Sequence, residues 1–241
     1  MPNYLRPQSV GEVLRNAAEI YGRNFGVIFV TYFLPVFPIG VWQKEAQVAR
    51  ALGWSLFAFI CLFVASCIAW GAITIAVSDI CLGNKPSIAR SYQKIFSGAL
   101  GRLFVAGLLQ TLSVLIGLVL CVVPGVTAML WFMLTPPAVM LEGFGGTKAL
   151  QRSKQLAQGY LGRNFLVLIL LIIIGAVIGG IVGGILGGLQ LTETFLFRFA
   201  LLAIQTLIAP FSITAMILLY YDLRVRKEAY DAAALAEDLR R

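Results

Sequence analysis

Long apolar runs separated by short polar segments dominate the chain. A run of about 20 apolar residues is long enough for a helix to cross a bilayer. The sequence therefore predicts an all-α integral membrane protein, a six-span helical bundle. The predicted spans run approximately over Phe25–Trp42, Ala51–Ser78, Leu103–Val123, Pro124–Leu141, Phe165–Leu189 and Phe195–Tyr221.

The fourth span is the least regular of the six. We expect a tight turn at Val123–Pro124–Gly125 before it, with the proline opening its helix. The span is short and contains Pro136–Pro137, which favours a kinked or re-entrant segment. Broken backbone at membrane depth needs protein or water to satisfy the freed polar groups. The sequence leaves open whether this span is complete.

A short segment with helical periodicity precedes each odd-numbered span. Apolar positions three and four residues apart, with basic residues opposite, predict a helix lying in the membrane interface. Ser9 and Glu12 have the spacing of a capping box, and Ser87 is a second predicted N-cap. The residues on these apolar faces are Val10, Val13, Ala17 and Tyr21; Ala89, Tyr92, Phe96 and Leu100; and Leu150, Ser153, Ala157 and Leu161, with Ser153 interrupting the third face.

An internal repeat accompanies this periodicity. Gly22–Arg23–Asn24–Phe25 recurs as Gly162–Arg163–Asn164–Phe165, and more loosely as Gly101–Arg102–Leu103–Phe104. Each even span ends on an acid, in turn Asp79, Glu142 and Asp222. We therefore predict one membrane domain, 1–241, made of three units of interfacial helix plus transmembrane hairpin. The units cover about 9–79, 87–142 and 147–222, and a cytoplasmic tail covers 223–241.

The distribution of positive charge predicts the orientation. Of the 19 Lys and Arg residues, only Lys44, Arg50 and Arg198 lie on the side opposite both termini. The loops on that side, about Gln43–Arg50 and Gln190–Thr194, are short, which is the condition under which basic loops mark the cytoplasm. Both termini are therefore predicted to be cytoplasmic.

Composition supports the membrane assignment. Hydrophobic residues make up 59% of the 241 residues and charged residues 12%, whereas soluble domains carry about 25% charged residues. A net charge of +8 on such a chain indicates contact with anionic lipid on the cytoplasmic side and not with nucleic acid.

The repeated arginines and acids are the sharpest candidate site. Each arginine opens an odd span and each acid closes an even one, so all six are expected at one membrane depth. They could form a ring of charge pairs, or the arginines could bind lipid phosphates. Simple headgroup anchoring and stapling of neighbouring hairpins is the favoured alternative. The simplest circle pairs Asp79 with Arg102, Glu142 with Arg163, and Asp222 with Arg23.

Two further residue sets fall inside the spans. Gly175, Gly179, Gly183 and Gly187 form a glycine zipper that favours close helix packing within the chain, with a homo-oligomer interface as the alternative. Gln110, Ser113, Gln205 and Ser212 are polar at mid-span and are candidate cavity-lining residues. Residues of this kind more often bond to a neighbouring helix than to a substrate.

Recognisable enzyme signatures are missing from the sequence. The chain has no histidine, which removes the Ser-His-Asp and metal-binding HExxH arrangements. The acids are far apart in sequence and lie at the membrane surface. We therefore expect no enzymatic activity, no cofactor and no metal site.

The C-terminal segment Leu218–Glu228, with the Gly-Arg-Asn-Phe motif and the Val123–Pro124–Gly125 turn, resembles a family of uncharacterised bacterial membrane proteins. The family is labelled glycerophosphoryl diester phosphodiesterase membrane domain. The catalytic domain that gave the label has no counterpart here. The resemblance implies the bacterial plasma (inner) membrane and does not imply the phosphodiesterase reaction.

These observations favour a non-enzymatic membrane module that organises lipid or a partner protein. The alternative is a permease or lipid-moving transporter with a site between repeats, which a continuous cavity lined by the mid-span polar residues would support. The expected partners are membrane lipids with anionic headgroups, together with a second copy of the chain or another membrane protein.

Overall fold

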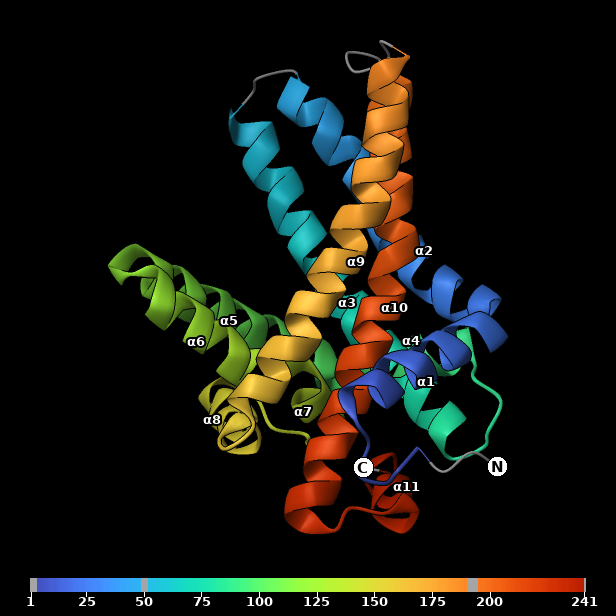
Figure 1. The fold of residues 1–241 in the computed structure, drawn as a ribbon, viewed down its shortest axis with the longest axis vertical. Helices are drawn as coiled ribbons and strands as arrows, with labels where there is room; N and C mark the ends of the chain where they lie inside the picture. The colour runs from blue at the N-terminus through green and yellow to red at the C-terminus, as the bar shows by residue number, and fades with distance from the viewer. Residues whose placement is uncertain (1–3, 49–51, 190–194, 241) are drawn as a thin grey trace.

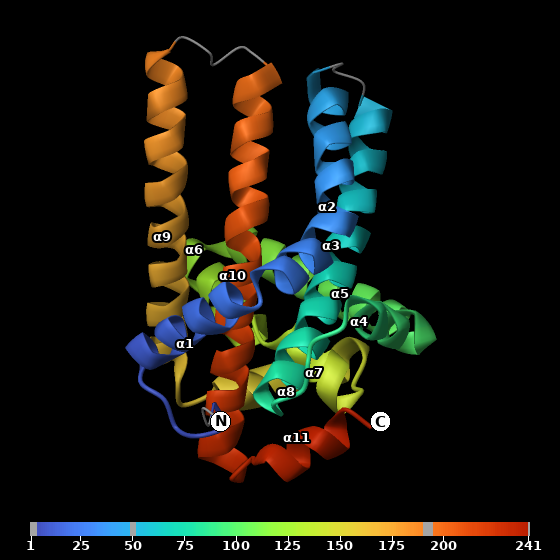
Figure 2. The ribbon, with the colours of Figure 1, turned by 90° about the vertical axis from the view of Figure 1, so that its right-hand side faces the viewer.

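The computed structural model describes residues 4–48, 52–189 and 195–240, and every regular element within them is helical (Figures 1 and 2). Six helical segments in this part of the chain are long and apolar enough to cross a membrane. The prediction of an all-helical chain with six candidate spans is therefore confirmed. They are α2 (Phe25–Val48), α3 (Leu52–Cys81), α5 (Leu100–Leu120), α6 (Val122–Phe132) continued by α7 (Thr135–Glu142), α9 (Leu161–Gly188) and α10 (Phe195–Glu228).

The long helices pack as neighbours in sequence: α2 with α3, α5 with α6, and α9 with α10. In Figure 1 the α5–α6 hairpin points away from the other two hairpins. Helix α2 continues to Val48, so it covers most of the first predicted outer loop. Residues 49–51 and the second predicted outer loop at 190–194 lie outside the described residues.

Four shorter helices gather at one end of the molecule, where both chain ends also lie (Figure 2). They are α1 (Val10–Arg23), α4 (Ile88–Lys94), α8 (Gly146–Ala157) and α11 (Ala232–Asp238). We call this end the base. The capping box of Ser9 and Glu12 is present, and the Ser87 side chain accepts from the Arg90 backbone N–H, so both predicted caps are confirmed.

The interfacial helix predicted before the third span is interrupted. A π-helical turn over Ile95–Ala99 joins α4 to α5, and Gly98 within it has φ +127°, which favours glycine. The extra residue in this turn rotates the face that follows. Phe96, inside the turn, is 63% exposed, and Ala89, before the turn, is also exposed, whereas Tyr92 and Leu100 of the same predicted face are half-buried.

The turn between α5 and α6 lies at Cys121, whose backbone is extended. The turn is therefore before the predicted Val123–Pro124–Gly125, and Pro124 lies in the first turn of α6, where no N–H is needed. The two helices approach very closely beside this turn. A Cβ on Gly125 would lie 2.8 Å from the Leu118 backbone nitrogen, so only glycine fits there.

The fourth span is broken, as Pro136–Pro137 suggested. Helix α6 ends at Phe132, α7 begins at Thr135, and both prolines lie in the first turn of α7. Ser153 of α8 supplies hydrogen bonds to the backbone at this break. Its hydroxyl donates to the Trp131 carbonyl (2.7 Å) and accepts from the Leu134 N–H (3.2 Å). The polar residue that interrupts the apolar face of α8 thus satisfies two backbone groups at the break between α6 and α7.

Candidate functional site

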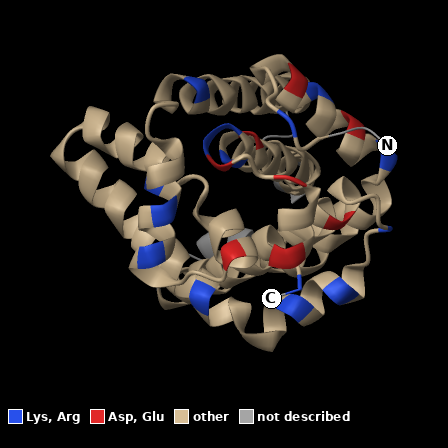
Figure 3. Cartoon of the chain, turned by 90° about the horizontal axis from the view of Figure 1, so that it is seen from below, with Lys and Arg blue, Asp and Glu red and all other residues tan. Residues whose placement is uncertain are grey.

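The C-terminal end of α10 is the polar centre of the base. Its polar side chains, within the segment Leu218–Glu228, reach different neighbouring elements. Seen from below, this end of α10 lies inside the ring of the other helices, and charged positions lie on it and around it (Figure 3). We call this end of α10 and its polar partners the hub.

Two adjacent tyrosines connect α10 to two different spans. The Tyr220 hydroxyl donates to Glu142 Oε1 at the end of α7 (2.5 Å). The Tyr221 hydroxyl shares a hydrogen bond with the Ser78 hydroxyl of α3 (2.5 Å). Both tyrosine side chains are fully buried, so neither phenol can exchange these partners for water without local opening.

Asp222 connects the segment before α1 to α10. Its Oδ1 accepts from the backbone N–H of Gln8 (2.6 Å), and its Oδ2 pairs with Arg163 of α9 (2.9 Å) and Arg226 (3.0 Å). Both arginines also donate to the Gln8 carbonyl. Asp222 is completely buried. The backbone N–H and C=O of a single residue before α1 are therefore both bound by side chains of α9 and α10.

Arg224 makes the second part of the hub with the C-terminal helix. Its NH1 lies 2.7 Å from Asp238 Oδ2 in α11, and its Nε lies 3.1 Å from Glu228 Oε2. The guanidinium also lies over the Tyr230 ring, 3.7 Å from the centroid. Tyr230 donates to Asp238. Burial and this hydrogen bond raise the pKa of Tyr230 well above its usual range, so its phenol stays a neutral donor.

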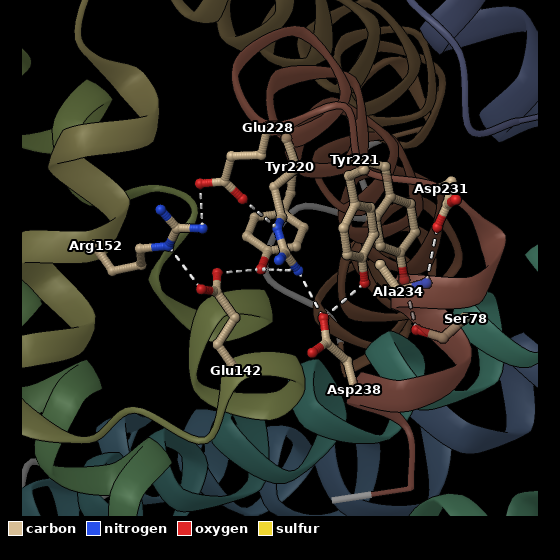
Figure 4. Close-up of polar contacts among 11 residues, drawn as sticks. Ser78, Glu142, Arg152, Tyr220, Tyr221, Glu228, Asp231, Ala234 and Asp238 are labelled. Atoms are coloured by element: carbon tan, nitrogen blue, oxygen red, sulfur yellow. Dashed lines mark hydrogen bonds and ion pairs between the residues drawn. The ribbon is translucent and has the colours of Figure 1, made fainter.

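Arg152 of α8 completes the network that Figure 4 shows. Its Nε lies 2.7 Å from Glu142 Oε2, and its NH2 lies 2.6 Å from Glu228 Oε1. Glu142 and Glu228 thus each have two partners, and α7, α8, α10 and α11 are joined through charge-assisted hydrogen bonds. Removing one partner from such a network lowers the stability of the fold, because the remaining partner is left as a desolvated, unpaired charge.

The three predicted ion pairs are wrong in their partners. Asp79 pairs with Arg90 of α4 (3.1 Å), Glu142 with Arg152 of α8, and Asp222 with Arg163 and Arg226. The reason is geometric: after each of the first two acids the chain folds into a base helix that brings an arginine back over the acid. The signal in the sequence was an arginine 11 residues after Asp79 and 10 after Glu142.

The remaining two predicted arginines pair with none of the three predicted acids. Arg23 pairs with Glu19 one turn earlier (3.0 Å) and is 70% exposed. Arg102 donates to the carbonyl of Gly143 (2.7 Å), directly after α7. Arg102 therefore caps the C-terminal end of α7, and neither residue belongs to a closed ring of the six predicted side chains.

Most acids of the described residues form ion pairs with arginines. Several Lys and Arg side chains, in contrast, have no carboxylate partner. Ion pairs with arginine occupy Glu12, Glu19, Asp79, Glu142, Asp222, Glu228 and Asp238. Among the described residues, four exposed cations on the base helices and loops have no carboxylate partner. They are Arg15, Lys85, Lys148 and Arg240.

Two cavities lie among the spans. One, of about 180 Å³, lies between α3, α5 and the α6–α7 span and is lined in part by Gln110. The other, of about 170 Å³, lies between α2, α3 and α10 and is lined in part by Gln205. Ser66 lines both. Ser113 and Ser212 line neither, and their hydroxyls donate to carbonyls of their own helices.

The glycine zipper does not pack within the chain where its surroundings are described. A Cβ added at Gly175, Gly179 or Gly183 would meet nothing within 4 Å. The predicted contact inside the chain is therefore wrong at these three positions. Gly187 belongs to the same helix, and the surroundings of its backbone are not described.

The hub is an arrangement for joining helices. Within the described residues no three His, Cys, Asp or Glu side chains lie close enough together to hold a metal ion. Comparisons with protein-family models, curated proteins and solved structures gave no match for this chain. The role of the hub therefore has to be argued from its own contacts.

Proposed function

We propose that this chain is a non-enzymatic, multi-pass module of the bacterial plasma membrane that organises lipid around a rigid basic base. The observation that carries the proposal is the charge distribution at the base. Within the described residues, most acids pair with arginines, while Arg15, Lys85, Lys148 and Arg240 are exposed and have no carboxylate partner. An excess of free cations at a membrane surface attracts anionic headgroups.

The three-unit organisation is part of this proposal. Each closing acid contacts the segment that begins the next unit: Asp79 meets α4, Glu142 meets α8, and Asp222 meets the backbone just before α1. This succession supports units placed around an axis and closed by the Asp222 contact. A closed base would hold its exposed cations at fixed separations, which suits a surface that positions headgroups.

Reconstitution in lipid tests the proposal. We expect phosphatidylglycerol, compared with phosphatidylcholine, to raise the apparent unfolding temperature by roughly 5 °C or more, because each cation near an anionic surface contributes about 1 kcal/mol. Changing Arg15, Lys85, Lys148 and Arg240 to glutamine should remove most of that rise. A matched variant that exchanges Arg for Lys and Lys for Arg at the same positions should keep it. An equal rise in the neutralised variant would contradict the proposal.

The proposed orientation places the base in the cytoplasm, in agreement with the family resemblance and the basic bias. In a cysteine-free background, Lys85→Cys in the base should be labelled by a membrane-impermeant maleimide only after the cells are opened. Lys44→Cys, near the other end of α2, should be labelled in intact spheroplasts. Labelling of both positions from one side would contradict the topology.

A lipid-moving transporter is the second candidate, and the two cavities at membrane depth favour it. They are separate cavities that share only Ser66, and not one continuous path. The discriminating experiment is dithionite reduction of a fluorescent phospholipid in proteoliposomes. The module that we propose leaves the protected fraction at the value of protein-free vesicles. Loss of the protected fraction would favour the transporter.

A further inference from the structure

The cavity between α3, α5 and the α6–α7 span has a mostly apolar lining. Apolar side chains such as Phe63, Trp70 and Val139 form most of its wall, and none of its lining residues is charged. The cavity is partly open to the outside of the bundle. At about 180 Å³ it equals roughly six water molecules at about 30 Å³ each.

Gln110 is the polar feature of this cavity. It lies in the middle of α5 (Leu100–Leu120), about 15 Å along the helix from either end at 1.5 Å per residue. Within the described residues its carboxamide makes no hydrogen bond, although it has two donor hydrogens and an acceptor oxygen. Leaving such a group without a partner in hydrocarbon is costly.

The hydroxyls in the wall already donate elsewhere. Ser66 donates to the Leu62 carbonyl (2.8 Å), Thr111 to Gly107 (2.9 Å) and Thr135 to Phe132 (2.7 Å). Among the described residues of this wall, the side-chain N–H groups that make no hydrogen bond belong to the Gln110 carboxamide and to the Trp70 indole. A water cluster that filled the cavity would therefore lie mostly against apolar surface, where few of its members could bond to protein.

The broken span contributes to the same wall, because Met133, Thr135 and Pro136 line the cavity beside Gln110. The wall thus combines apolar surface with a few uncharged polar side chains around Gln110.

From this lining we infer that the cavity binds a neutral membrane amphiphile, a hydrocarbon chain with one uncharged hydroxyl or carbonyl group bonded to Gln110. A hydrocarbon chain fills the apolar part of the space without needing polar partners. A charged group is disfavoured because no side chain in the wall could compensate its charge. The site is independent of the anionic headgroup contacts at the base, which lie on other residues and at another depth.

The test is photolabelling of the full chain in lipid nanodiscs with a diazirine-bearing long-chain alcohol. We expect saturable labelling of α3 and α5 peptides around the cavity, displaced by unlabelled oleyl alcohol. Gln110→Leu should raise the half-saturating concentration about tenfold, the effect of one lost hydrogen bond of ordinary strength. Gln205→Leu, the same change in the other cavity, should leave it unchanged, and so should neutralisation of the four base cations.

Three results would overturn the inference. One is labelling that never saturates and is spread evenly over the lipid-facing side chains of α9. Another is an unchanged half-saturating concentration in Gln110→Leu. The third is equal, competitive labelling by the matching diazirine fatty acid, which is charged. The unfolding temperature of each variant is measured in the same nanodiscs, and Gln110→Leu is expected to keep the wild-type value because leucine is compatible with the span.

Discussion

Asp222→Ala is expected to lower the free energy of unfolding by about 3–5 kcal/mol, the range found when one partner of a buried ion pair is removed. Asp222 is completely buried and binds the Gln8 N–H, Arg163 and Arg226. Its loss leaves two guanidinium groups without their carboxylate and one backbone N–H without its acceptor. The measurement is thermal or denaturant unfolding of the purified protein in detergent.

The double variant gives the prediction its specificity. Adding Arg163→Ala to Asp222→Ala should recover part of the loss, because it removes one of the uncompensated charges. Arg23→Ala should recover none of it, since Arg23 pairs with Glu19 at the surface. Glu19→Ala is the matched control for an exposed pair and should cost at most about 1 kcal/mol. Strictly additive losses for Asp222 and Arg163 would show that their contact does not stabilise the fold.

Arg224→Met should be comparably damaging. The substitution keeps most of the apolar stem but removes the charge that binds Asp238 and Glu228 and lies over the Tyr230 ring. Asp238 is then left buried with Tyr230 as a neutral donor. We expect a loss of about 3–5 kcal/mol in detergent unfolding, together with earlier proteolysis of the C-terminal helix α11.

Removing the charge of Asp238 as well should restore part of the stability that Arg224→Met loses. Asp238→Asn still accepts from Tyr230 but carries no charge, so the double variant should be more stable than Arg224→Met alone. Arg15→Met changes an exposed arginine without an ion pair and should stay within about 0.5 kcal/mol of the wild type. Equal unfolding temperatures for Arg15→Met and Arg224→Met would exclude a stabilising role for the hub.

The spans and helix starts could be predicted because their signals are local. Apolar length identifies a membrane helix without knowledge of its neighbours, and the Ser9–Glu12 box is a contact over three residues. The proline pair likewise identified the break in the fourth span. What repairs the break could not be predicted, because Ser153 lies 22 residues from Trp131 and only the packing of α8 brings them together.

The ion pairs failed for a related reason. Placing Arg102 and Asp79 at one membrane depth fixes their height but not their rotation about the axis of the bundle. In the structure the base helices α4 and α8 pack beside the acids, so Arg90 pairs with Asp79 and Arg152 pairs with Glu142. The glycine zipper also illustrates this limit, since spacing defines a small-residue face but not whether the chain supplies a helix to cover it.

The hub was only partly visible in the sequence. The segment Leu218–Glu228 carries the family resemblance, but the sequence predicts a cytoplasmic tail over residues 223–241. The structure instead continues α10 to Glu228 and folds α11 against it. An Asp231 N-cap before an alanine-rich segment was the available local signal. Gln8 contacts Asp222, and Asp238 contacts Arg224, only because the chain folds back on itself. No local sequence pattern predicts these two contacts.

Lipid identification after detergent-free extraction tests the central claim most directly. The protein is excised from bacterial membrane with its surrounding lipid in polymer nanodiscs, and the lipid is quantified by mass spectrometry against the bulk membrane. We predict enrichment of anionic lipid around the wild type and bulk composition around the variant with Arg15, Lys85, Lys148 and Arg240 changed to glutamine. Bulk composition around the wild type, or enrichment that survives in this variant, would contradict the account.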